Sequence, residues 1–340
     1  MRLLKVSIEL SEFSLSKSTL SKKITLYLMV FGPGLVVMLA DTDAGSVITA
    51  AQSGAQWGYK LLLPQFILIP ILYIAQELTV RLGLATGKGH GELIKQHFGI
   101  FWAWISVSTM VITCIGAIIT EFSGIAGVGM LFGIPKIVSL SLVIAFLMVM
   151  VITRTYKSVE RVALCIGAFE LIFFLVAWRA QPPSLTMLTQ MLHMPLMNTN
   201  YVYLLAANIG AVIMPWMIFY QQSAVVDKGL SIKNLTAARW DTAIGSVITQ
   251  LIMAAILITT AATLYSHHKH SQLNTIGDIA SSITPYLGNT TGTILFSMGM
   301  IGAALIATIV VTLTAAWGIG EVTGFKHSLE HSPKEAPWFY

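Results

Sequence analysis

The stretch Leu39–Gly54 reads LADTDAGSVITAAQSG, and it decides how the rest of the chain is interpreted. It lies inside a long apolar run, residues 24–57, and it carries Asp41 and Asp43 where a helix crossing lipid should carry no charge. A charged side chain at the centre of a bilayer costs about 2.5–3.5 kcal/mol on insertion scales, so such residues usually bind ions, relay protons or pair. Gly45 follows and weakens the helix. The stretch therefore predicts an interrupted helix with a carboxylate at the interruption.

The composition predicts a polytopic membrane protein. Of the 340 residues, 55% are hydrophobic and 10% are charged, whereas soluble domains carry about 25% charged residues. Runs of about 20 apolar residues recur, and this length crosses a hydrocarbon core about 30 Å thick. We expect eight such spans, at residues 24–57, 60–84, 101–131, 137–153, 161–178, 200–226, 242–265 and 291–320.

The distribution of basic residues predicts the orientation of the chain. If the N-terminus is cytoplasmic and the eight spans alternate, most of the 20 lysines and arginines lie on the cytoplasmic side; Lys60, Lys136, Arg179 and Lys269 lie outside. This bias matches the positive-inside rule. We therefore expect a multi-pass protein of the cell membrane, in contact with the lipid bilayer. The net charge of +5 needs no nucleic-acid partner to explain it.

A second span, residues 200–226, also contains helix-breaking residues, near Gly210 and at Pro215. The first and sixth spans occupy equivalent places if the chain consists of two five-helix halves of opposite orientation. Paired interrupted spans in matching positions predict a transport site at the bilayer midplane. Two ordinary kinks in a helical bundle are the alternative.

This pattern predicts an all-α membrane protein with a five-plus-five inverted repeat whose helices 1 and 6 are broken. The expected parts are a cytoplasmic N-terminal segment (1–23), a first repeat (24–178), an external loop (179–199) and an incomplete second repeat (200–340). Ten spans would complete two repeats. Because eight are found, we expect the second repeat to hold helices 6 to 8 and the start of helix 9, so that the chain is truncated.

Other acidic residues in the apolar spans receive different interpretations. Glu121, in IITEFSGIAGVG, is a second intramembrane carboxylate that is either a site residue or a group hydrogen-bonded within the bundle. Glu170, in AFELIFF, is interpreted as structural. Asp41 is expected to face an aqueous vestibule or to cap a half-helix. Asp241 opens the seventh span and is interpreted as a helix-start residue.

These segments resemble the Nramp family of divalent-metal transporters. The family's first-span motif, Asp-Pro-Gly-Asn, is present as Asp43-Ala44-Gly45-Ser46. RLGLATGKG (81–89) is similar to the end of the family's second span, LFGIP (131–135) to the segment before its fourth, and GAVIMP (210–215) to its sixth-span Met-Pro motif. The resemblance extends from about residue 24 to 340 and implies a leucine-transporter-like fold.

The resemblance also implies a set of metal ligands and several departures from the family. The family's metal ligands correspond to the Asp43 carboxylate, Ser46 in place of Asn, the backbone carbonyl of Ala211 and the sulfur of Met214. The family's histidine after Met-Pro is Trp216 here, and a further histidine is replaced by Gln221 or Gln222. The acidic pair of the third span keeps Glu121, while its earlier partner is Ile118.

The departures indicate Mg²⁺ as the transported ion. A soft thioether in a tight site favours transition metals, whereas Mg²⁺ is usually held through one or two carboxylates and retains several waters. Asp43, Glu121 and the small Ser46 suit a partly hydrated Mg²⁺, as in the prokaryotic Nramp-related magnesium transporters, with Mn²⁺ as a second substrate. We expect alternating access with little or no proton coupling, and no cofactor.

Three alternatives remain open. The first is a proton-coupled Mn²⁺/Fe²⁺ importer of the mainstream type, which would need the histidines and acids that are replaced here. The second is an intramembrane aspartyl hydrolase using Asp43 and Glu121, which would need two carboxylates that share a proton; no second catalytic motif supports an enzyme. The third is a metal sensor that binds ions without transporting them.

Overall fold

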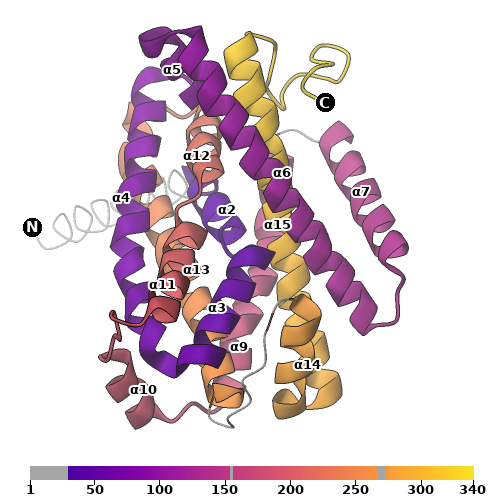
Figure 1. Cartoon of the computed structure of the whole chain (residues 1–340). Helices are drawn as coiled ribbons and strands as arrows, with labels where there is room; N and C mark the ends of the chain where they lie inside the picture. The colour runs from indigo at the N-terminus through magenta and orange to yellow at the C-terminus, as the bar shows by residue number, and fades with distance from the viewer. Residues whose placement is uncertain (1–29, 154–155, 266–272, 274) are drawn as a thin grey trace, which may run out of the picture.

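The structure, a computed structural model, describes residues 30–153, 156–265, 273 and 275–340, and the regular elements of this part are helices (Figure 1). Six helical stretches are long and apolar enough to cross a membrane: Ala44–Thr86, Ile100–Leu131, Tyr156–Arg179, Thr199–Asp227, Ile232–Thr263 and Thr290–Thr323. A seventh apolar helix, Lys136–Met150, is shorter. The expectation of an all-α membrane protein is confirmed, although six described helices rather than eight meet this length.

The first predicted span is divided, which accounts for part of the difference. Helix α2 (Pro33–Ala40) and helix α3 (Ala44–Trp57) are separated by residues 41–43, and residues 24–29 of the predicted span lie outside the described residues. Helix α3 continues through the 3₁₀ turn η1 (Gly58–Leu61) into α4 (Leu62–Thr86). The predicted interruption is confirmed. It lies at Asp43, whose backbone is extended, while Gly45 belongs to the first turn of α3.

The second interruption lies between α11 (Thr199–Val212) and α12 (Pro215–Asp227). Pro215 is the first residue of α12, where a missing N–H costs no helical hydrogen bond. Helix α11 runs through Gly210, so the interruption expected near that residue was wrong. A glycine within a helix costs about 1 kcal/mol, which packing readily offsets, and does not by itself end the helix.

The other elements complete a bundle around two long helices, α13 and α15. Helix α13 packs on α2, α3 and α4, and α15 packs on α6 and α2. The remaining bounds are α5 (His90–Phe98), α6 (Ile100–Leu131), α7 (Lys136–Thr153), α8 (Tyr156–Gly167), η2 (Ala168–Leu171), α9 (Ile172–Arg179), α10 (Ser184–Met191), η3 (Ile232–Asn234), α13 (Leu235–Thr263), α14 (Ile276–Leu287) and α15 (Asn289–Thr323).

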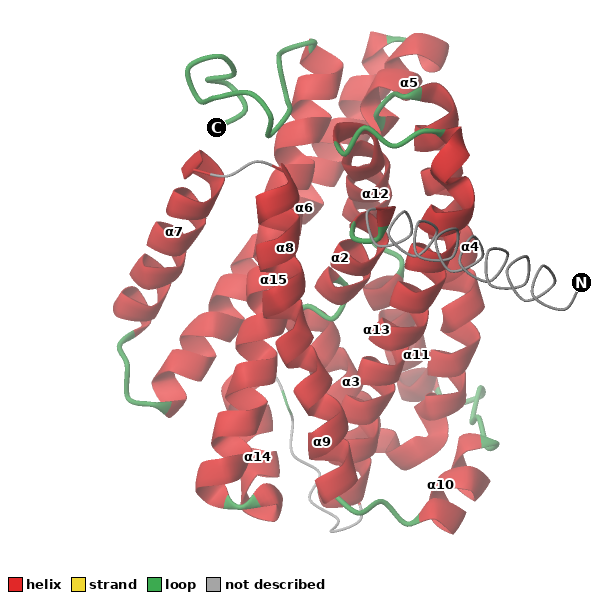
Figure 2. Ribbon diagram, turned by 180° about the vertical axis from the view of Figure 1, so that it is seen from behind, coloured by secondary structure: helices red, strands yellow, loops and turns green. Residues whose placement is uncertain are grey.

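The bundle has two distinct ends. Helix α5 lies at one end, which we call the α5 end, and α10 and α14 lie at the other, the α10 end (Figure 1). Helices α2 and α12 lie nearer the α5 end, and α3 and α11 lie nearer the α10 end. Figure 2, seen from behind, shows α7 at the edge of the bundle, and it packs on α6.

The outer faces of the bundle are apolar, as lipid contact requires. On α4, Ile67, Ile71, Ile74 and Leu78 form a row at helical spacing, and each is more than 40% exposed. In contrast, the interior holds fully buried aromatic side chains such as Trp317 and Tyr220. Because a helix satisfies its own backbone hydrogen bonds, it can present such an apolar face to hydrocarbon. The chain is a multi-pass membrane protein.

Candidate metal site

The two helix breaks meet at Ser46 and Ala211. The Ser46 hydroxyl donates to the Ala211 carbonyl at 3.3 Å, so the first turn of α3 contacts the last turn of α11. The Asp43 carboxylate caps α3 by accepting the Ser46 N–H at 2.7 Å. Both side chains are buried. The structure therefore brings together three of the residues predicted as metal ligands.

Glu121 reaches the same helix terminus from α6. Its carboxylate accepts the Ala44 N–H, at 3.1 Å from one oxygen and 3.3 Å from the other, and the side chain is fully buried. The N-terminus of α3 thus faces two carboxylates, those of Asp43 and Glu121, and its partial positive charge favours both. The two interpretations of Glu121 are compatible, because it is hydrogen-bonded within the bundle and lies beside the break.

Met214 lies on the second break, between α11 and α12. It is the residue before the first turn of α12, and its carbonyl accepts the Met217 N–H at 3.1 Å. Its side chain is partly buried against the main hydrophobic core. The next position after Pro215 holds Trp216, which is buried, and the indole N–H has no hydrogen-bond partner among the described residues.

The donor set around the breaks is mostly oxygen. Within the described part of the chain, no three His, Cys, Asp or Glu side chains gather closely enough to hold a metal ion. An ion at the breaks would therefore combine one or two carboxylates with the Ser46 hydroxyl, backbone carbonyls and water. Unwound backbone between half-helices can supply such carbonyls where it lines a cavity.

Asp241 holds the other end of α2. It lies within α13, which begins at Leu235, so the interpretation of Asp241 as a helix-start residue was wrong. Its carboxylate accepts the N–H groups of Gly32 at 3.1 Å, Gly34 at 2.7 Å and Leu35 at 3.2 Å. A Cβ atom on Gly34 would lie 2.8 Å from the Asp241 Oδ2 atom, so this close approach requires glycine. Asp241 therefore caps α2 across the bundle.

A buried set of polar side chains joins α11 to α3 and α4 on the α10 side of the breaks. The Gln65 amide donates to Asn208 Oδ1 at 2.6 Å, and the Asn208 amide donates to the Ser53 hydroxyl at 2.8 Å and to the Leu204 carbonyl at 2.7 Å. Gln65, Ser53 and Asn208 are fully buried, and we call them the Asn208 clamp. The sequence-based expectations did not include these three residues, although an asparagine within the apolar run of residues 200–226 indicates a buried polar contact.

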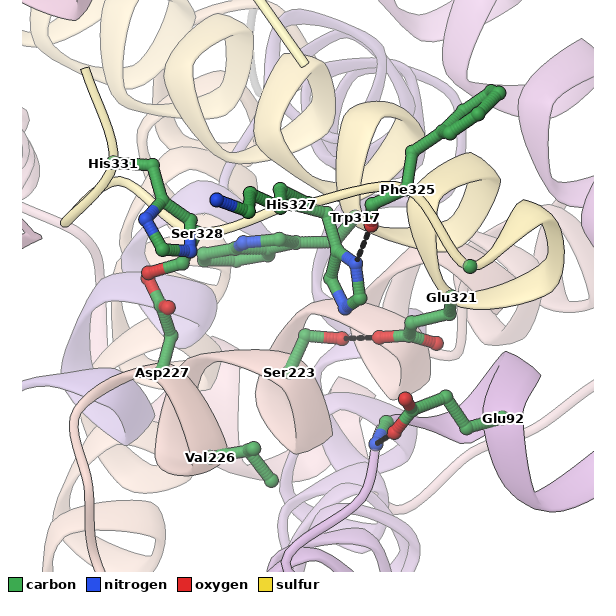
Figure 3. Close-up of a pocket in the computed structure, with 13 residues that line it drawn as sticks. Glu92, Ser223, Val226, Asp227, Trp317, Glu321, Phe325, His327, Ser328 and His331 are labelled. Carbon is green, nitrogen blue, oxygen red and sulfur yellow. Dashed lines mark hydrogen bonds between the residues drawn. The ribbon is translucent and has the colours of Figure 1, made fainter. Parts of the chain in front are cut away.

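A cavity of about 340 Å³ opens at the α5 end, away from the breaks (Figure 3). Glu321 of α15 points toward Ser223 of α12 in this view, and its carboxylate accepts the Ser223 hydroxyl at 2.5 Å. The same carboxylate accepts the Gly91 N–H of α5 at 2.7 Å. The Glu321 carboxylate therefore links α15 to α12 and to α5.

Next to this cavity, His90 of α5 contacts α12. The Gln222 amide nitrogen donates to the Lys88 carbonyl at 2.8 Å, which leaves the amide oxygen, 2.9 Å from His90 Nδ1, as an acceptor. We therefore assign the hydrogen of the neutral imidazole to Nδ1. Burial lowers the pKa of His90 below its usual value.

Comparisons with known proteins support a family assignment. The family model described as natural resistance-associated macrophage protein-like, Nramp, matches residues 34–340. The chain is 31% identical over 309 residues to the divalent metal cation transporter MntH of Klebsiella pneumoniae, covering 88% of this chain and 73% of that protein. It is 30% identical over 302 residues to MntH of Yersinia pestis, covering 86% and 72%.

Solved structures agree on the fold. A crystal structure of the Eremococcus coleocola manganese transporter, in complex with an aromatic bis-isothiourea substituted compound, matches with a TM-score of 0.74 at 18% identity, covering 91% of this chain and 68% of that one. A mutant of the same transporter matches with a TM-score of 0.72, covering 90% and 67%. The chain belongs to the Nramp family.

Proposed function

We propose that this chain transports divalent metal ions at the meeting point of its two helix breaks, with Mg²⁺ as substrate and Mn²⁺ as a second one. The observation that carries the proposal is the hydrogen bond between Ser46 and the Ala211 carbonyl beside the Asp43 carboxylate, which places hard oxygen donors from both breaks together. Relatives described as divalent metal cation transporters match over most of the chain.

The donor set supports Mg²⁺. Mg²⁺ requires a nearly octahedral shell of oxygens, loses water reluctantly and is usually bound through one or two carboxylates. Asp43 and Glu121 are two buried carboxylates beside one helix terminus. The short Ser46 side chain, which already donates to Ala211, leaves ligand positions to be filled by water.

The residues around the breaks support transport with little or no proton coupling. Trp216, directly after Met214-Pro215, carries an indole, which does not act as an acid or a base at physiological pH. Ile118, one turn before Glu121 on α6, also has no titratable group. A proton following the metal ion would therefore lack a titratable group at both positions.

The contacts at the two ends of the bundle suggest how access alternates. The bonds from Asp241 hold α2 against α13 toward the α5 end. The Asn208 clamp holds α11 against α3 and α4 toward the α10 end. Opening either side requires breaking the corresponding set of bonds. With the N-terminus in the cytoplasm, as the basic residues predict, the α5 end faces the cytoplasm.

A proton-coupled Mn²⁺/Fe²⁺ importer is a second candidate, and Met214 favours it. A thioether at the break would select transition metals over Mg²⁺. The matched structures are of a manganese transporter.

Flux measurements distinguish the two candidates. The chain would be reconstituted in liposomes, with Mg²⁺ or Mn²⁺ entry followed by a trapped indicator and lumenal pH recorded in parallel. We expect Mg²⁺ entry without acidification, its loss in Asp43→Ala and its retention in Met214→Ala. Met298→Ala, at a partly exposed methionine of α15, is the matched control. Mn²⁺ entry with acidification, without Mg²⁺ entry and dependent on Met214, would refute the proposal and support the second candidate.

A further inference from the structure

Two buried carboxylates near the breaks have no role in the site described above. Asp41 is 1% exposed and Glu170 is 0% exposed. Both oxygens of each carboxylate lack a hydrogen-bond partner among the residues that the structure describes. An ionised carboxylate buried without a partner costs several kcal/mol, and native proteins keep such charges paired or bound to metals. Each carboxylate is therefore either neutral, with a bound proton, or paired with a cation.

The two carboxylates lie on segments that pack together. Asp41 directly follows α2 as its C-cap, and Glu170 lies in η2, between α8 and α9. Helix α8 packs on α2 so closely that a Cβ atom on Gly167 would lie 2.9 Å from the Leu39 side chain. Glu170 interacts electrostatically with Asp41 and faces the Thr42 hydroxyl. The carbonyl end of α2, which carries partial negative charge, lies at the same place.

Other buried carboxylates show that the two are exceptional. Each of the following has a donor: Asp43 (Ser46 N–H), Glu121 (Ala44 N–H), Asp241 (three N–H groups), Glu321 (Ser223 and Gly91), Glu160 (Lys228) and Glu77 (Arg81 and Arg239). Each of these six therefore accepts a hydrogen bond or forms an ion pair within the protein. None of the four carboxylate oxygens of Asp41 and Glu170 has a hydrogen-bond partner among the described residues, and the Thr42 hydroxyl beside Glu170 is a neutral group that cannot balance their charge.

We propose that Asp41 and Glu170 bind a second divalent cation, beside the ion at Asp43, Ser46 and Ala211 and distinct from it. Two carboxylates balance the charge of one divalent ion, and hard oxygens are the donors that Mg²⁺ and Mn²⁺ prefer. The Thr42 hydroxyl, which is 2.8 Å from the Thr249 hydroxyl on α13, supplies a neutral oxygen. The proposal goes beyond the transport function and does not depend on which metal is transported.

Metal stoichiometry tests the second site with Mn²⁺ as the probe. The full chain would be purified in detergent, and bound Mn²⁺ would be counted by equilibrium dialysis with elemental analysis. We expect about two Mn²⁺ ions per chain in the wild type and about one in Glu170→Gln and in Asp41→Asn. We also expect dipolar broadening of the Mn²⁺ electron paramagnetic resonance signal in the wild type, and its loss in Glu170→Gln. Glu321→Gln, which alters a buried carboxylate at the α5 end, is the matched control and should leave the count unchanged.

Several outcomes would overturn the second site. About one Mn²⁺ per chain in the wild type would do so, and this result does not depend on whether a variant folds. An unchanged count in folded Glu170→Gln would also do so. An infrared band of a protonated carboxylic acid that disappears in Glu170→Gln would show that the pair holds a proton in place of a metal ion. Two bound ions in a chain without Mg²⁺ flux would leave the second site standing while refuting the proposed substrate.

Discussion

Replacing Asn208 with leucine is expected to release α11 from α3 and α4. Asn208 is fully buried and joins the three helices through Gln65 and Ser53, at 2.6 and 2.8 Å. Leucine has a similar volume but neither accepts nor donates. Gln65 would then be stranded, because its Oε1 atom already lacks a partner among the described residues.

The magnitude follows from the two bonds between helices. A buried hydrogen bond contributes about 1 kcal/mol net, so losing both costs the closed arrangement about 2 kcal/mol. At about 1.4 kcal/mol per factor of ten, the ratio of open to closed protein should rise roughly thirtyfold. The stranded Gln65 amide can only increase this value.

Labelling of a buried cysteine measures this ratio. Val212, the last residue of α11, is one turn beyond Asn208 and is 1% exposed. A Val212→Cys reporter would be introduced with Cys165→Ser, because Cys165 is exposed and Cys114 is buried. The rate of modification by a water-soluble maleimide should rise roughly thirtyfold in Asn208→Leu.

A double variant separates loss of the clamp from general damage. With both Asn208 and Gln65 replaced by leucine, two apolar groups face each other and no amide is stranded. The labelling rate of this variant should therefore be lower than that of Asn208→Leu alone. An unchanged labelling rate in Asn208→Leu would refute the reasoning. So would a double variant whose change in the free energy of opening equals the sum of the changes in Asn208→Leu and Gln65→Leu.

Three further perturbations test other contacts, each by the midpoint of thermal unfolding in detergent. Asp241→Asn places an amide donor among the N–H groups of α2 and should cost about 1–3 kcal/mol; a midpoint equal to that of the control Glu335→Gln, at the surface, would contradict the capping role. Because burial lowers the pKa of His90 from its usual 6.5, its neutral form contributes stability that is full above about pH 6.5 and is lost as pH falls through the lowered pKa. His90→Gln should flatten this decline. If the unfolding midpoint fell equally steeply with pH in the variant and in the wild type, the result would contradict this role of His90. Glu77→Gln breaks ion pairs with arginines that are 40–50% exposed, so the loss should be below about 1 kcal/mol and should vanish in high salt; a larger, salt-independent loss would indicate a different role.

Local sequence was sufficient to predict the helical membrane fold, the break at Asp43 and the break before Pro215, although not that α11 continues through Gly210. Apolar runs specify helices because lipid offers no partner for backbone groups. Pro215 and Asp43 specify the starts of α12 and α3 through a missing N–H and a capping carboxylate, which are local effects. The motifs around Asp43 and Pro215 were also sufficient to indicate the Nramp family, which the family model confirms.

The partners of the buried polar groups were decided by the tertiary structure. Asp241 was assigned to its own helix from sequence, but its carboxylate caps α2, 207 residues from it at Gly34. Asn208 and Gln65 pair across 143 residues, and neither position alone indicates the other. Glu170 was interpreted as structural, and only the packing of α8 on α2 brings it into electrostatic interaction with Asp41. Hydropathy and capping act within a few residues along the chain, whereas a buried carboxylate or amide takes its partner from whichever helix packs against it.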